Sequence, residues 1–118
     1  MIENNKNLKP LDSIFIGSFY FDKTINGNLI GEFSNNETDF IMTESAMTKP
    51  TNSTFEGTYI STWYDIDLNK ATLEITKIGC KYKLDWTEPG KQGYEGEGFL
   101  TGAKLIGFYT KKKTAQNK

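Results

Sequence analysis

The sequence predicts an all-β fold: an antiparallel, up-and-down β-barrel of about eight strands, with a short helix or none. Three observations lead to this prediction. Short runs that alternate apolar and polar residues recur along the chain. Tight-turn signals such as Asn26-Gly27 separate these runs. The links are short, so neighbouring runs pair as hairpins, and an even number of hairpin strands closes into a barrel without exposed edges.

Each expected strand is rich in β-branched and aromatic residues and is bounded by turn signals. The expected strands are residues 13–21, 28–34, 38–43, 54–64, 71–78, 80–87, 94–100 and 103–110. Asn26-Gly27 turns the chain after the first strand, because both residues tolerate positive φ. Gly79 gives a short turn after the fifth strand, and residues 88–92 form a loop after the sixth.

Residues 44–52 are an ambiguous segment. Met42, Ala46 and Met47 are spaced to share one face of a short helical turn. Pro50 would stop such a turn, because proline lacks the backbone N–H that a helix interior needs. The sequence therefore leaves a short helix open in this segment.

A single domain is expected at residues 13–110, since the chain has the length of one core. Residues 1–12 are polar and offer nothing to bury, so they are expected to form a flexible lead. Residues 111–118 begin with three lysines and are expected to form a basic, flexible tail that aids solubility.

A glycine between two large apolar residues recurs within the strands. The copies are Phe15-x-Gly17-x-Phe19, Leu29-x-Gly31-x-Phe33, Phe55-x-Gly57-x-Tyr59 and Leu105-x-Gly107-x-Tyr109, with a degenerate fifth at Tyr94-x-Gly96-x-Gly98. Strand alternation places each glycine on the buried face with its large neighbours. Two explanations stay open together: sharp bends that allow barrel closure, and a hollow middle layer that could hold a ligand.

Four strand segments share a recognisable pattern: residues 56–59 (EGTY), 71–75 (ATLEI), 82–86 (YKLDW) and 94–98 (YEGEG). In this pattern the chain resembles small bacterial lipocalin-like and avidin-like (calycin-type) barrel domains, and the resemblance spans roughly residues 13–110. It implies a closed barrel and a habit of binding small molecules. It does not name a ligand, because the polar residues with which avidins bind biotin have no counterpart here.

The composition excludes several kinds of chemistry. The chain has no histidine and only one cysteine, Cys80. Ser-His-Asp and Cys-His catalysis, histidine-ligated haem, the usual zinc sites and internal disulfides are therefore excluded. Asp65, Asp67 and Asn69 alternate in a loop but lack the further oxygen ligands of a calcium site. We expect no metal, no cofactor and no catalytic residues. An enzyme is the last-ranked interpretation, because its acid–base chemistry would depend on Asp, Glu or Tyr alone.

Glu95 and Glu97 are expected on the surface rather than at a catalytic site. Alternation turns both side chains outward when Trp86 lies opposite Tyr94 in a hairpin. That register also places Lys83 opposite Glu97, as a cross-strand ion pair in water.

Inward-facing aromatic residues are the candidate ligand site. Alternation gives one inward set of Tyr59, Ser61, Trp63, Tyr82, Trp86 and Tyr94. We expect a cavity beside Trp63 and Trp86 that holds a small apolar or aromatic ligand, which tyrosine and serine hydroxyls would orient. A fully packed barrel core is the competing interpretation.

Outward-facing apolar residues suggest a second function. Ile16, Ile30, Ile106 and Phe108 are expected to form one exterior patch across the first, second and last strands. Soluble monomers seldom leave such a patch bare, so it predicts a homo-oligomer or another protein partner. The protein would then be an inhibitor, an immunity-type protein or a structural subunit.

Charge and hydropathy limit the remaining partners. The formal net charge of −1 gives no general attraction to nucleic acid or to anionic lipid, so neither is expected as a partner. The first ten residues lack an apolar signal core, and no apolar run is long enough to span a membrane. We expect a soluble, cytoplasmic protein, or a secreted one if a signal peptide has been removed.

Overall fold

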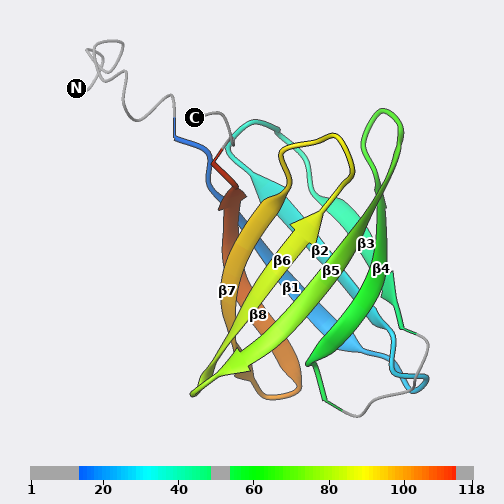
Figure 1. Ribbon diagram of the computed structural model, residues 1–118, viewed down its shortest axis with the longest axis vertical. Coiled ribbons are helices and arrows are strands. Elements are labelled where there is room, and N and C mark those ends of the chain that lie inside the picture. The colour runs from blue at the N-terminus through cyan, green and yellow to red at the C-terminus, as the bar shows by residue number, and fades with distance from the viewer. Residues whose placement is uncertain (1–13, 49–53, 114–118) are drawn as a thin grey trace.

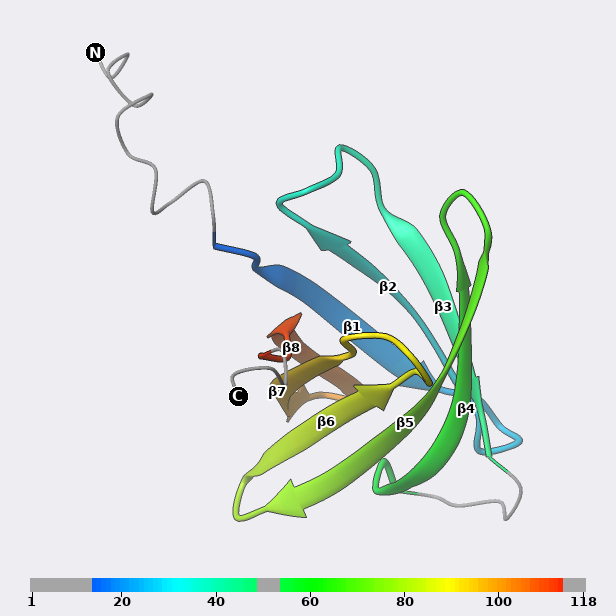
Figure 2. The same ribbon diagram turned by 45° about the horizontal axis from the view of Figure 1, so that its top comes forward.

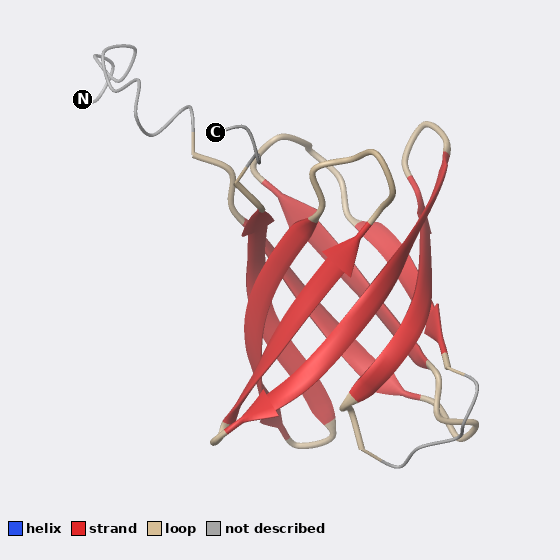
Figure 3. Cartoon of the chain, in the orientation of Figure 1, coloured by secondary structure: helices blue, strands red, loops and turns tan. Residues whose placement is uncertain are grey.

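The structure, a computed structural model, describes residues 14–48 and 54–113. The described residues form eight strands and no helix, as Figures 1 and 3 show. The strands are β1 (Gly17–Lys23), β2 (Leu29–Asn35), β3 (Met42–Met47), β4 (Gly57–Tyr64), β5 (Leu68–Ile78), β6 (Lys81–Thr87), β7 (Tyr94–Thr101) and β8 (Lys104–Lys111). The all-β prediction is confirmed.

Every strand pairs antiparallel with the next one along the chain, and β8 pairs with β1 to close the ring. Figure 2 shows this closed arrangement from a tilted view. The closing register places Gly17 opposite Tyr109 and Phe21 opposite Leu105. The predicted hairpin between β6 and β7 is also present, with Trp86 opposite Tyr94 and Lys83 opposite Glu97. The up-and-down barrel that the turn signals predict is therefore confirmed.

The prediction that left a short helix open in residues 44–52 is wrong for the described part of that segment. Met42–Met47 is strand β3, and it lies between β2 and β4 with Ala46 opposite both Leu29 and Ser61. Its inward side chains alternate as Met42, Glu44 and Ala46, all of them buried. Residues 49–53 of the ambiguous segment lie outside the described residues.

Both predicted terminal segments lie largely outside the described residues, which begin at Ile14 and end at Lys113. Within the described part, β8 continues through Lys111, one residue beyond the expected strand end. Lys111 is paired with Glu37 and Lys112 with Asp85, so these two lysines make ion pairs with the barrel.

Three of the recurring glycines, Gly31, Gly96 and Gly107, mark places where the backbone of a neighbouring strand comes close. A Cβ atom on Gly31 would overlap the carbonyl oxygen of Tyr20, and one on Gly107 would overlap that of Glu97. A Cβ on Gly96 would likewise collide with the carbonyl oxygen of Phe108, so the hollow middle layer offered as one explanation of the repeat is absent at this glycine. Close backbone approach, rather than a hollow middle layer, is the steric reason for these glycines.

The core fills the part of the barrel away from the loops at residues 36–41, 65–67 and 88–93. Those loops lie together at one end of the barrel (Figure 1). The buried side chains include Phe21, Leu29, Tyr59, Leu73, Ile75, Tyr82, Leu84 and Leu105. Within the described ranges, no helix is long and apolar enough to cross a membrane.

Candidate ligand-binding site

A cavity of about 160 Å³ lies inside the barrel and reaches the end that carries the three loops. Its walls are largely aromatic, formed by Phe15, Phe19, Phe33, Trp63, Trp86, Tyr94 and Tyr109. The remaining lining residues are Asn35, Glu37, Thr38, Met42, Glu44, Asp65 and Lys111. Most of the aromatic side chains come from different strands, at inward positions near the loop end. The described residues thus form an aromatic chamber with a few polar groups.

Tyr109 of β8 is at the centre of the aromatic wall. A Cβ on Gly17, the residue opposite Tyr109 on β1, would collide with the Tyr109 ring, so glycine at this position lets the ring lie across β1. The Tyr109 ring centroid lies 5.7 to 6.0 Å from those of Phe15, Phe33, Trp86 and Tyr94. The Gly-x-aromatic repeat therefore contributes to the site through ring packing.

Glu44 of β3 is the buried acid of the cavity, with 4% of its surface exposed. Ser61 Oγ and Trp86 Nε1 both donate hydrogen bonds to its Oε2 atom, the latter at 2.8 Å. No described residue donates a hydrogen bond to Oε1. Burial raises the pKa of the Glu44 carboxyl to about 7, although the two hydrogen bonds act in the opposite direction. Near neutral pH the cavity therefore contains a carboxyl group that gains or loses its proton readily.

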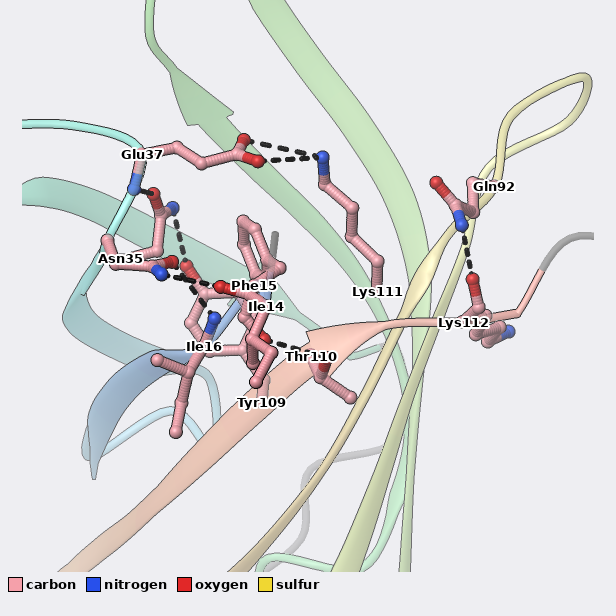
Figure 4. Close-up of polar contacts among 11 residues, drawn as sticks. Ile14, Phe15, Ile16, Asn35, Glu37, Gln92, Tyr109, Thr110, Lys111 and Lys112 are labelled. Carbon is pink, nitrogen blue, oxygen red and sulfur yellow. Dashed lines mark hydrogen bonds and ion pairs between the residues drawn. The ribbon is translucent and has the colours of Figure 1, made fainter. Parts of the chain in front are cut away.

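The rim of the cavity carries an ion pair and a hydrogen bond, both drawn in Figure 4. Lys111 Nζ lies 3.3 Å from both carboxylate oxygens of Glu37, so β8 is tied to the loop after β2. Asn35 Nδ2 donates to the Tyr109 hydroxyl oxygen at 3.0 Å. Burial raises the pKa of Tyr109 to about 12, so its hydroxyl stays neutral at physiological pH.

The segment before β1 brings Phe15 to the cavity. Asn36 holds this segment at two points, because its side chain donates to the Ile14 carbonyl and accepts from the Ile16 N–H. Thr110 Oγ1 donates to the Phe15 carbonyl oxygen at 3.1 Å (Figure 4). These contacts fix the Phe15 backbone, and its ring packs against Tyr94 and Tyr109.

The six residues predicted to bind a ligand occupy three levels of the barrel. Trp63, Trp86 and Tyr94 line the cavity together. Ser61 is fully buried and contacts the cavity only through its hydrogen bond to Glu44.

Tyr59 and Tyr82 belong to the core away from the cavity. The Tyr59 hydroxyl donates to the Phe55 carbonyl at 2.9 Å and accepts from Lys23 Nζ at 3.0 Å. The Tyr82 ring packs against Phe55, with centroids 6.4 Å apart. Both are buried, as alternation predicts, but neither is part of the cavity lining.

The sequence prediction missed Glu44 and several aromatic residues of the cavity wall. Phe19, Phe33 and Tyr109 stand in the recurring glycine motif, which signals their inward direction but not their place along the barrel. Glu44 is in the ambiguous segment. Treating Met42, Glu44 and Ala46 as one alternating face would have placed its carboxyl inside the barrel.

The predicted exterior patch faces outward but is not continuous. Ile16, Ile30 and Phe108 are 55%, 45% and 57% exposed, and Ile106 is half-buried. Asp22 lies opposite Ile30 on one side and Lys104 on the other, and the two charged groups pair at 3.0 Å. This ion pair separates Ile30 from the other three patch residues.

The surface carboxylates make ion pairs in a diagonal pattern. Lys83 Nζ lies 3.8 Å from Glu95, and Lys81 Nζ lies 3.4 Å from Glu97. The register is as predicted, but the expected Lys83–Glu97 pair is replaced by these diagonal contacts, because the long lysine side chains reach a neighbouring row. Asp85 pairs with Lys112. Both glutamates are on the outer surface, away from the cavity.

The acidic loop after β4 is held by its own hydrogen bonds. Asp65 Oδ1 accepts from the backbone N–H of Asp67 and from Asn69 Nδ2, both at 3.2 Å. Within the described residues, no group of three or more acidic or cysteine side chains is arranged to hold a metal ion. Cys80 is exposed at the turn between β5 and β6.

Comparison of the chain with protein-family models, with curated proteins and with solved structures finds no match. A functional argument therefore starts from the cavity itself. Its volume, its aromatic walls and its buried carboxyl define what it could bind.

Proposed function

We propose that this protein is a non-enzymatic binding protein that holds a small apolar or aromatic ligand in the cavity at the loop end of the barrel. The observation that supports this is a chamber with seven aromatic walls and a few convergent polar groups. Small-molecule sites have this composition, since apolar walls supply affinity and a few polar atoms supply orientation.

The volume limits the size of the ligand. An engineered apolar cavity of about 150 Å³ holds one benzene molecule, and this chamber of about 160 Å³ is of the same size. Drug-sized ligands occupy pockets of roughly 300–1,000 Å³. A ligand with a single aromatic ring therefore fits best, with any further atoms directed toward the open end.

The fold agrees with this proposal. Closed up-and-down barrels such as the lipocalins enclose one small ligand among side chains that point inward. The resemblance to lipocalin-like domains has the same implication, and the closed topology is consistent with it. Fold likeness alone does not decide function, so the cavity carries the argument.

Tryptophan fluorescence offers a direct test. The chain has two tryptophans, Trp63 and Trp86, and both line the cavity, so any ligand bound there should change their emission. Titration with benzyl alcohol is expected to give a saturable change. Replacing the half-buried wall residue Tyr94 with alanine should weaken binding roughly 3- to 10-fold, the equivalent of one aromatic contact.

Tyr64→Ala is the matched control. Tyr64 also belongs to β4 and its loop end, but its side chain is 65% exposed and is not part of the cavity lining. Its removal should leave benzyl alcohol affinity unchanged. A folded wild-type protein that shows neither a fluorescence change nor a calorimetric signal with benzyl alcohol or with its amine analogue benzylamine would contradict the proposed function.

Self-association is a second candidate function, and the exposed Ile16 and Phe108 side chains favour it. A second copy of the chain could cover these side chains together with Ile106 and with Phe99, which lies opposite Ile106 and is 54% exposed. Contiguous exposed apolar residues of this kind are typical of protein contact surfaces.

A further inference from the structure

We propose that the cavity recognises ligands that carry a protonated amine, and that the Glu44 carboxylate binds the ammonium group. This inference rests on the proposed function, because it names the class of small molecule that the cavity holds. Three features of the described residues support it: the free carboxylate oxygen, the aromatic walls and the balance of charge around the cavity.

The hydrogen bonds of Glu44 leave one carboxylate oxygen available. Ser61 Oγ and Trp86 Nε1 both donate to Oε2, and no described residue donates to Oε1. The side chain is 4% exposed and belongs to the cavity lining, so water reaches it only through the chamber. Oε1 is therefore an accessible acceptor inside the chamber, where an entering donor or cation can satisfy it. An ammonium group supplies three donors and the opposite charge.

The walls around Glu44 are suited to a cation. Trp86, which donates to Glu44, has its ring centroid 5.8 Å from that of Phe19 and 5.9 Å from that of Tyr109. Trp63, whose position on β4 is directly opposite Glu44, packs edge-on against Phe33 at 6.1 Å. Ring faces carry partial negative charge and attract ammonium groups, most strongly where water is excluded.

The charged groups of the lining also favour a cation over an anion. The lining contains three acids, Glu37, Glu44 and Asp65, and one base, Lys111. Lys111 is paired with Glu37 at the rim. The Glu44 carboxylate would therefore repel an anionic ligand, and the one lysine of the lining is already paired with Glu37. The same carboxylate would attract an ammonium group.

The two tyrosines of the lining, Tyr94 and Tyr109, are neutral at physiological pH. Burial raises the pKa of Tyr94 and raises the pKa of Tyr109 to about 12. Burial also raises the pKa of Glu44 to about 7, and binding of an ammonium group would stabilise its ionised form. Affinity for an ammonium ligand should therefore rise with pH up to about 7, and binding below that pH should release a proton.

Benzylamine and benzyl alcohol form a matched pair of probes. They share one ring and one methylene group and differ in whether the head group is charged. The wild-type protein is expected to bind benzylamine at least about tenfold more tightly at neutral pH, as one charge-assisted hydrogen bond allows. Glu44→Gln should remove this preference, measured as the ratio of the two affinities within the variant. Glu95→Gln, which removes an exposed carboxylate of β7, should preserve the preference.

A second measurement needs no variant. Calorimetry of the wild-type protein at about pH 6, in two buffers with different protonation enthalpies, should show proton release with benzylamine and none with benzyl alcohol. Alkyl ammonium groups keep their own proton at that pH.

The outcomes separate the two proposals. Wild-type protein that binds benzyl alcohol as tightly as benzylamine, or that binds benzylamine without proton release, overturns the amine inference and leaves the proposed function standing. A preference for benzylamine that survives in Glu44→Gln also overturns it. Failure of both probes to bind contradicts the proposed function itself.

Discussion

Replacing Glu44 with glutamine should remove a pH-dependent loss of folding stability. Glutamine has nearly the same shape and keeps an oxygen that can accept the hydrogen bonds from Ser61 and Trp86. It cannot ionise. The comparison of the two proteins therefore isolates the effect of placing a negative charge at this buried position.

The sign and size of the effect follow from the pKa of Glu44, which burial raises from 4.5 to about 7. Below 4.5 the carboxyl is protonated in both the folded and the unfolded chain. Between 4.5 and about 7 the unfolded chain loses this proton while the folded chain keeps it, so stability falls as pH rises. Above about 7 both states are ionised and the loss is complete. A shift of this size corresponds to about 3 kcal/mol.

Urea unfolding without ligand, followed by tryptophan fluorescence between about pH 4 and pH 8, measures this difference. The free energy of unfolding of the wild-type protein should fall relative to that of Glu44→Gln by about 3 kcal/mol across the range. Glu95→Gln should give a curve parallel to the wild type, because its carboxylate is on the surface. Parallel curves for the wild type and Glu44→Gln would refute a buried carboxyl with a raised pKa.

Two further predictions concern the barrel wall. Gly107→Ala should lower the free energy of unfolding by at least about 1–3 kcal/mol, because its Cβ would overlap the Glu97 carbonyl oxygen; unchanged urea midpoints would contradict the close approach. Ile106→Lys combined with Phe108→Lys should lower the mass seen by light scattering without unfolding the barrel. A wild-type protein that is monomeric at high concentration would argue against self-association.

The fold could be predicted because its signals are local. Alternation and turn residues act over a few positions, and together they specify hairpins that close in only a few ways. Strand β3 is the exception. Its central inward position is occupied by Glu44, whose partners Ser61 and Trp86 are 17 and 42 residues away in the chain. A single sequence does not show these partners, so the segment lacked the apolar alternation of a strand.

The candidate site could be predicted only in part, because alternation gives the face of a residue but not its level along the barrel axis. On β4, the side chains of Tyr59, Ser61 and Trp63 all face the interior of the barrel. Tyr59 is in the packed core, Ser61 is beneath Glu44, and only Trp63 lines the cavity. Which of these residues lines the cavity depends on the register between strands and on which end of the barrel is open. Both are properties of the closed barrel and not of one strand.

Folding stability and ligand recognition are coupled through Glu44. Removing its carboxylate from water costs folding energy above about pH 7, and the same desolvation strengthens its attraction for a cation that enters the chamber. A ligand that binds only the folded chain stabilises it in proportion to the logarithm of its concentration over its Kd. A bound ammonium ligand would therefore restore stability most strongly at the pH values where the unliganded barrel has lost it. A neutral aromatic ligand would stabilise the barrel by an amount that does not depend on the charge of Glu44 in this way.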